Sequence, residues 1–160
     1  MFPLLSNTIF VNRTTNNRVM GEARKKTKVI IVEDNRYMMK LYEEYVLKSD
    51  DAMIAGTFSN IASVKAYFEN GGRADFVILD IQLHDGNGLQ LIPFVKSFND
   101  RTKIIVATTY IEFKKYREDL NIDFFLDKMG DLHKIASILN DEGERLKEKE
   151  VERKRTNLEA

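Results

Sequence analysis

The sequence predicts an α/β protein in which helices cover both faces of a parallel sheet. Short apolar segments alternate, five times along the chain, with segments whose apolar residues recur at helical spacing. This alternation is typical of consecutive βαβ units, in which the strands run parallel. The run KVIIV at residues 28–32 is continuously apolar, which indicates a strand buried on both faces.

The first half of the pattern contains three predicted strands and two predicted helices. The strands are expected at 28–32, 52–58 and 75–79. In the first helix, expected within 35–48, apolar residues recur at i, i+3, i+4, i+7 and i+8 from Met38, which forms one stripe. The second helix is expected at 61–72, where Gly71 and Gly72 stop it.

The second half repeats the pattern with weaker helical signals. Strands are expected at 103–107 and 123–126, and helices at 89–98, at 113–120 and from 131 onward. Pro93 lies near the first turn of its helix, where a missing amide hydrogen matters least. The segment FKKYREDL (113–120) is short and charged, so it predicts only a weak helix.

Composition limits the classes of function. The chain has 160 residues, 43% of them hydrophobic, which suits one domain with tails. Its 25 basic and 25 acidic residues cancel, so no global field recruits nucleic acid or an anionic membrane. No apolar run approaches the roughly 18 residues that span a bilayer. Cysteine is absent, which excludes disulfides and thiolate metal sites and fits a cytoplasmic protein.

The two ends of the chain differ from the central pattern. Residues 1–27 are rich in Asn, Thr and Arg without a sustained period, and we expect a disordered basic arm or a start codon assigned too early. Residues 28–143 form the predicted domain. Residues 144–160 carry charges of alternating sign, which indicates a charged helical tail.

Polar residues follow four of the five predicted strands. They are Glu33 and Asp34, Asp80, Thr108 with Thr109 as a rival, and Asp127 with Lys128. Ligands of open parallel sheets collect beyond the carboxyl ends of the strands, so these side chains should converge. Clustered carboxylates need a cation, and an all-oxygen set favours Mg²⁺. A lysine and a hydroxyl beside that ion suit phosphoryl transfer to an aspartate.

These residues, in this order and spacing, resemble the receiver domain of two-component response regulators over residues 28 to about 140. The resemblance implies a flavodoxin-like (βα)₅ fold, a doubly wound parallel five-stranded sheet with strand order 2-1-3-4-5. It also implies that Glu33 and Asp34 correspond to the acidic pair that holds Mg²⁺, and that Asp80 is the phosphoacceptor. The backbone carbonyl of Gln82 would complete the metal ligands.

The same resemblance assigns the remaining roles. Thr108 would be the hydroxyl residue that moves onto the phosphoryl group, Phe125 the aromatic switch residue and Lys128 the cation that pairs with the phosphate. Two positions depart from the family pattern, because His84 and Met129 stand where proline is usual. The resemblance also implies that Asp80 accepts its phosphoryl group from a sensor histidine kinase or a histidine phosphotransfer protein.

The resemblance thus predicts a phosphoacceptor switch rather than an enzyme, acting without an output domain on an unknown protein target. A homodimer could form through the face of helix four, strand five and helix five. Two alternatives stay open: the receiver part of a DNA-binding transcriptional regulator, and a Mg²⁺-dependent phosphohydrolase with an aspartate nucleophile. The second usually needs an aspartate two residues after the first, where this chain has Gln82.

Overall fold

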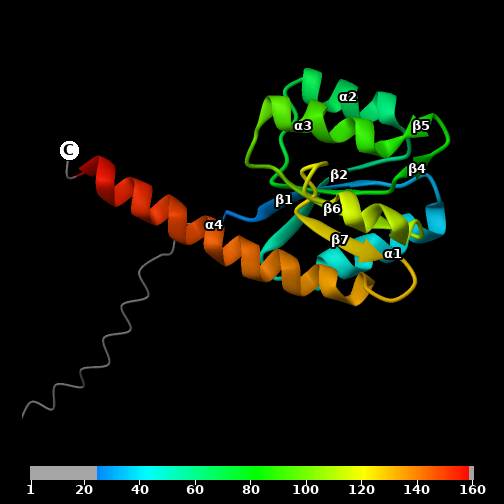
Figure 1. Ribbon diagram of the computed structural model, residues 1–160. Helices are drawn as coiled ribbons and strands as arrows, with labels where there is room; N and C mark the ends of the chain where they lie inside the picture. Colours follow the sequence, from blue (N-terminus) through cyan, green and yellow to red (C-terminus); the bar gives the residue numbers. More distant parts are fainter. Residues whose placement is uncertain (1–24, 159–160) are drawn as a thin grey trace, which may run out of the picture.

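The computed structural model describes residues 25–158 and contains one five-stranded parallel sheet (Figure 1). Its strands lie in the order β2-β1-β3-β6-β7, which confirms the predicted 2-1-3-4-5 topology. Their bounds are β1 Thr27–Val32, β2 Ala52–Phe58, β3 Phe76–Leu79, β6 Lys103–Thr108 and β7 Phe124–Asp127. A separate two-stranded antiparallel hairpin follows β3, formed by β4 Gln82–Leu83 and β5 Gly86–Asn87.

Two helices cover each face of the sheet. Figure 1 shows α2 (Ile61–Glu69) and α3 (Leu91–Phe98) on one side, and α1 (Arg36–Leu47) and α4 (Ile135–Leu158) on the other. Asparagine side chains define two of the helix starts. Asn35 accepts hydrogen bonds from the amides of Tyr37 and Met38, and Asn60 accepts one from the amide of Ser63.

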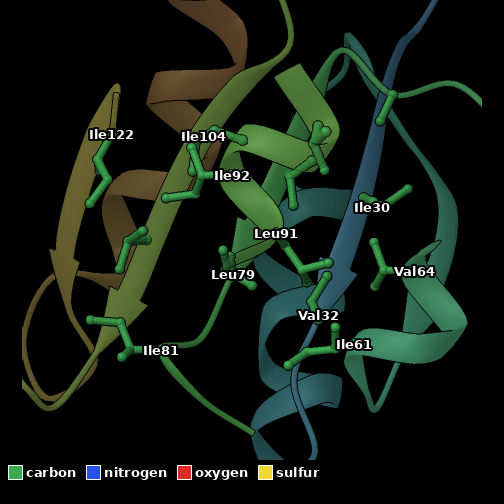
Figure 2. Packing of buried hydrophobic residues seen from close by; sticks show 14 of the residues in the cluster. Ile30, Val32, Ile61, Val64, Leu79, Ile81, Leu91, Ile92, Ile104 and Ile122 are labelled. Carbon is green, nitrogen blue, oxygen red and sulfur yellow. The ribbon is translucent and has the colours of Figure 1, made fainter. Parts of the chain in front are cut away.

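Each strand supplies residues to two separate cores, because side chains alternate between the faces of a sheet. Ile30 and Val32 of β1 pack toward α2 and α3, in the cluster shown in Figure 2. Val29 and Ile31 of the same strand pack toward α1 and α4. All four side chains are fully buried. Burial on both sides explains why β1 reads as a continuous apolar run rather than as an alternating one.

The helix expected at 113–120 is wrong. The structure has a 3-10 helix, η2, at Ile111–Tyr116, followed by turns that reach Asn121 with a φ of 54°. No residue of η2 is buried, and no side chain caps its start. Only Phe113 and Leu120 are partly buried against the core between residues 111 and 120, so the segment has little of the packing that stabilises most α-helices in proteins.

The other helices shift by a few residues at their ends. The helix expected at 61–72 ends at Glu69, and Gly71 adopts a φ of 89° that favours glycine. Short 3-10 turns, η1 (Gly88–Gln90) and η3 (Leu132–Lys134), precede α3 and α4.

Of the two predicted terminal segments, the tail lies mostly within the described residues and the arm lies mostly outside them. The arm expected at 1–27 lies largely outside the described range, and Thr27 already belongs to β1. At the other end, α4 continues without a break across the expected boundary at 143/144. Lys147, beyond that boundary, forms an ion pair of 2.6 Å with Asp51. None of the helices within residues 25–158 combines the length and the apolarity needed to cross a bilayer.

Asp123 fastens the edge strand β7 to the sheet. Its carboxylate accepts a hydrogen bond from the Ile104 amide at 2.8 Å, and it pairs with Lys103 at 3.0 Å and Lys96 at 3.3 Å. Burial by itself would raise the pKa of this carboxyl, but the amide and the two ammonium groups lower it below its ordinary value. The ionised form therefore stabilises the folded state.

We predict that Asp123→Asn lowers the free energy of unfolding at about pH 7 by roughly 1–3 kcal/mol, because it removes charged hydrogen bonds from a largely buried site. The lowered pKa means that the contribution of Asp123 is complete above the ordinary value of about 4, and is lost as the pH falls through the folded-state value. Urea denaturation should thus show a smaller difference between variant and wild type at about pH 3 than at about pH 7. The exposed Asp100→Asn is the control. A difference that grows on acidification would contradict this account.

Candidate functional site

The predicted acidic residues meet at the carboxyl edge of the sheet. Glu33 follows β1 and Asp80 follows β3, and these strands are direct neighbours, with Val32 paired to Leu79. One carboxylate oxygen each from Glu33, Asp34 and Asp80 lies within 4.8 Å of the others. The crossing of the chain from β1 to β3 therefore brings together acids that are almost fifty residues apart in sequence.

Lys128 joins two of these acids. It follows β7, and its Nζ lies 2.6 Å from Asp80 Oδ2 and 2.7 Å from Glu33 Oε2. The three side chains are nearly enclosed, with exposed fractions of 11% for Lys128, 8% for Asp80 and 1% for Glu33. The Lys128 amide also donates to the Thr108 carbonyl at 3.1 Å, which holds the end of β7 against β6.

The electrostatics of the site follow from this enclosure. Burial raises the pKa of the Glu33 carboxyl, although Lys128 and the Asn35 amide, which donates to Glu33 Oε1 at 3.0 Å, act in the opposite direction. Burial alone would lower the pKa of Lys128, but its contacts with Asp80 and Glu33 raise it instead. Lys128 therefore stays charged between two carboxylates.

The donor set fits a hard divalent cation. Three carboxylates offer oxygen atoms within one small space, and within residues 25–158 the lysine paired with them is Lys128. Mg²⁺ prefers oxygen ligands and keeps several of its waters, so it needs few protein groups. A cavity of about 380 Å³ lies over the acids, which leaves room for such waters and for a phosphoryl group. Its rim includes Met38, His84, Thr109, Tyr110 and Met129.

The structure places the predicted switch residues in the interior. Thr108 is fully buried at the end of β6, and its Oγ1 accepts a hydrogen bond from the Tyr110 amide at 3.2 Å. Thr109, its rival from the sequence, lines the cavity instead. Phe125 is 8% exposed and lies opposite Val106 in the pairing of β6 with β7.

Tyr110 is a site residue that the sequence analysis missed. Its hydroxyl donates to the side-chain Oε1 of Gln82, which connects the segment after β6 to the hairpin after β3. Both residues line the cavity over the acids. The signal available in the sequence was weak: Tyr110 stands only two residues beyond Thr108, yet an aromatic residue in a loop does not by itself indicate a site.

Comparison with known proteins identifies the family. Residues 29–140 match the family model described as the response regulator receiver domain. The chain belongs to this family. Its members are phosphoacceptor switches and generally not enzymes, they bind Mg²⁺ at an acidic pocket, and they work with histidine kinases or phosphotransfer proteins.

Curated relatives of this receiver domain are longer proteins. The transcriptional regulatory protein DcuR of Shigella flexneri is 24% identical over 94 residues, which cover 58% of this chain and 39% of DcuR. The photosynthetic apparatus regulatory protein RegA of Rhodobacter capsulatus is 25% identical over 120 residues, covering 74% of this chain and 63% of RegA. The chain thus spans less than two thirds of the length of either relative.

Solved receiver domains share the fold at low sequence identity. The isolated REC domain of RcsB from Salmonella enterica serovar Typhimurium, in the presence of phosphomimetic BeF3-, has a TM-score of 0.62 and 20% identity, covering 70% of this chain and 84% of that one. A CheY-like receiver domain protein from Methanospirillum hungatei has a TM-score of 0.66 and 14% identity, covering 78% and 98%.

Two backbone features shape the loops around Asp80 and Lys128 in this receiver domain. Met129, at a position where proline is usual, uses its amide to donate to Asp127 Oδ1 at 2.8 Å, which proline could not do. Gly88 packs against the backbone at Asp80, and a Cβ added there would lie 2.1 Å from the Asp80 carbonyl oxygen. Position 88 therefore requires a residue without a side chain.

We predict that Gly88→Ala destabilises the domain by roughly 1–3 kcal/mol, because the backbone after Asp80 must move to admit the methyl group. Thermal or urea unfolding measures the loss. Gly130→Ala is the matched control, since a Cβ there meets nothing within 4 Å. Equal stability of the two variants would show that the close approach at position 88 is not needed.

Proposed function

We propose that Asp80 accepts a phosphoryl group from a phosphohistidine on a sensor histidine kinase or a histidine phosphotransfer protein. The observation that carries the proposal is the position of Lys128 Nζ, 2.6 Å from Asp80 and 2.7 Å from Glu33, beside the third acid Asp34. This arrangement combines a nucleophilic carboxylate, a fixed cation and two further oxygen ligands under an open cavity.

The proposed reaction forms a bond between an Asp80 oxygen and phosphorus while the phosphorus–nitrogen bond of the donor breaks, its electron pair staying on the imidazole. Lys128 then pairs with the phosphoryl oxygens as a point charge. Glu33, Asp34, Asp80 and the carbonyl of Gln82 would hold Mg²⁺, which when bound supplies positive charge that offsets the repulsion between carboxylate and phosphoryl group. Water attack on the phosphorus of the acyl phosphate breaks its bond to the Asp80 oxygen, releases inorganic phosphate and returns Asp80 to the carboxylate.

The proposed switch involves the contacts of Thr108. Its hydroxyl now accepts from the Tyr110 amide, and turning toward a phosphoryl oxygen would give up this contact. The backbone before η2 would then move. This movement would change the space available to Phe125 on the neighbouring strand. The surface that responds comprises η2, β7 and α4, where Ile111 and Tyr116 are exposed, and we propose that a protein target or a second copy binds there.

A second candidate places this receiver in a DNA-binding transcriptional regulator. The observation in its favour is that DcuR is a transcriptional regulatory protein, of which the matched region covers 39%. The reading frame of the gene discriminates the two, since a regulator of this kind would continue past Ala160 into an output domain, whereas a receiver that acts alone would not.

We predict that the protein gains the mass of one phosphoryl group when it is incubated with Mg²⁺ and acetyl phosphate. Intact-mass spectrometry should detect this gain in the wild type and not in Asp80→Asn, which replaces the nucleophile by an isosteric amide. A mass gain that persists in Asp80→Asn would show that another residue accepts the phosphoryl group. An unchanged wild-type mass would reject phosphoryl transfer to this chain from a small donor.

We predict that Lys128→Ala slows this phosphorylation by at least about tenfold, because it removes a preorganised charge from the position of the phosphoryl oxygens. The rate of mass gain at a fixed donor concentration is the measurement. Lys154→Ala is the control, because Lys154 is 69% exposed and lies near the C-terminal end of α4. An unchanged rate in Lys128→Ala would remove this lysine from the mechanism.

A further inference from the structure

The turn between β4 and β5 contacts two elements that are distant in sequence. The His84 amide donates a hydrogen bond to Asp34 Oδ2 at 2.9 Å. The Asp85 carboxylate accepts from the Ile61 amide at 2.9 and 3.1 Å, and from the Ala62 amide at 3.3 Å. The central residues of this turn therefore connect the acidic site to the first turn of α2.

Asp34 is held differently from the other two acids. Glu33 and Asp80 are enclosed and pair with Lys128, whereas the Asp34 side chain is 30% exposed and receives the backbone amide of His84. A carboxylate at the rim of a cluster of like charges is repelled outward. The His84 N–H on Oδ2 opposes this repulsion and sets the direction of the carboxylate.

The contact with α2 explains why this N–H is fixed. Asp85 lies at the N-terminal end of α2, where free amides and the helix dipole favour a carboxylate. Its bonds to Ile61 and Ala62 restrain the turn independently of the contact with Asp34. A displacement of the turn that moved the His84 amide away from Asp34 would also break these bonds.

We propose that the backbone amide of His84, held by Asp85, is the positioning group that orients Asp34 toward a divalent cation. This inference rests on the proposed function, in which the acids hold Mg²⁺. Hydrogen bonds to ligating carboxylates are a general means of raising metal affinity. Proline, the residue usual in this family at position 84, has no amide hydrogen and could not make this contact.

The test compares His84→Pro with His84→Ala. Leu83 pairs with Gly86, so His84 is the first central residue of a four-residue turn, a position that accepts proline. The proline variant loses the amide hydrogen, and the alanine variant loses only the imidazole, whose Nδ1 is 3.8 Å from Asp34 Oδ2. Isothermal titration calorimetry of the unphosphorylated proteins with Mg²⁺ alone measures the dissociation constants.

We expect His84→Pro to weaken Mg²⁺ binding by about tenfold or more, as loss of a partner of a ligating group usually does, and His84→Ala to change it by less than about twofold. Equal binding in the proline variant and the wild type overturns the inference while leaving the proposed function intact. Equal losses in both variants also overturn it, since the imidazole would then be responsible. A wild type that binds no Mg²⁺ overturns both.

A second measurement does not depend on the folding of the proline variant. Amide hydrogen exchange followed by NMR should show the His84 amide protected in the wild type without Mg²⁺, and exchanging at least about tenfold faster in Asp34→Ala. The Asn87 amide is a control within the same hairpin, because Asn87 pairs with Gln82 rather than with Asp34. A His84 amide that exchanges equally fast in both proteins rejects the contact and, with it, the positioning role.

Discussion

The ion pair that Lys128 makes with both Glu33 and Asp80 is the interaction on which the site depends. Two enclosed carboxylates this close would repel each other, and burial makes that repulsion costly. A single ammonium group at 2.6 and 2.7 Å offsets it and remains charged as a result. The cluster still carries an excess of negative charge, since Asp34 lies beside it. The same lysine thus maintains the folded site and leaves it able to receive a cation.

The sheet topology makes this interaction possible. The acids come from the ends of β1 and β3, which are neighbours at the centre of the sheet, and Lys128 comes from the end of β7 at its edge. The five strands of this sheet are all parallel, so their carboxyl ends lie on one edge. The two cores on either side of the sheet keep this edge rigid, because each central strand is buried on both faces. The positions of the charged groups at the carboxyl edge therefore depend on the apolar packing of the two cores.

The loops around the site are held by specific hydrogen bonds as well as by the packing of Ile81 and Leu83 into the core. The hairpin after Asp80 is connected to α2 through Asp85, to Asp34 through the His84 amide, and to the segment after β6 through Gln82 and Tyr110. That segment continues into η2, none of whose residues is buried. The hairpin side of the site, near Glu33, Asp34 and Asp80, is restrained by these contacts, whereas η2 on the Thr108 side is mostly exposed and packs on the core through the partly buried Phe113.

The pattern of apolar residues by itself determined the parallel sheet, its covering helices, and the strand ends at which Glu33, Asp34, Asp80 and Lys128 stand. This was possible because a parallel strand buried on both faces needs a continuous run of apolar residues, which is visible locally in the sequence. The carboxyl ends of parallel strands then lie at the same edge of the sheet. The tertiary structure decided the rest: the absence of an α-helix at 113–120, the bridge of Lys128 between two acids, and the contacts of His84 and Tyr110. Those contacts join residues 28 to 95 positions apart, and they depend on the paths of loops, which no local periodicity encodes.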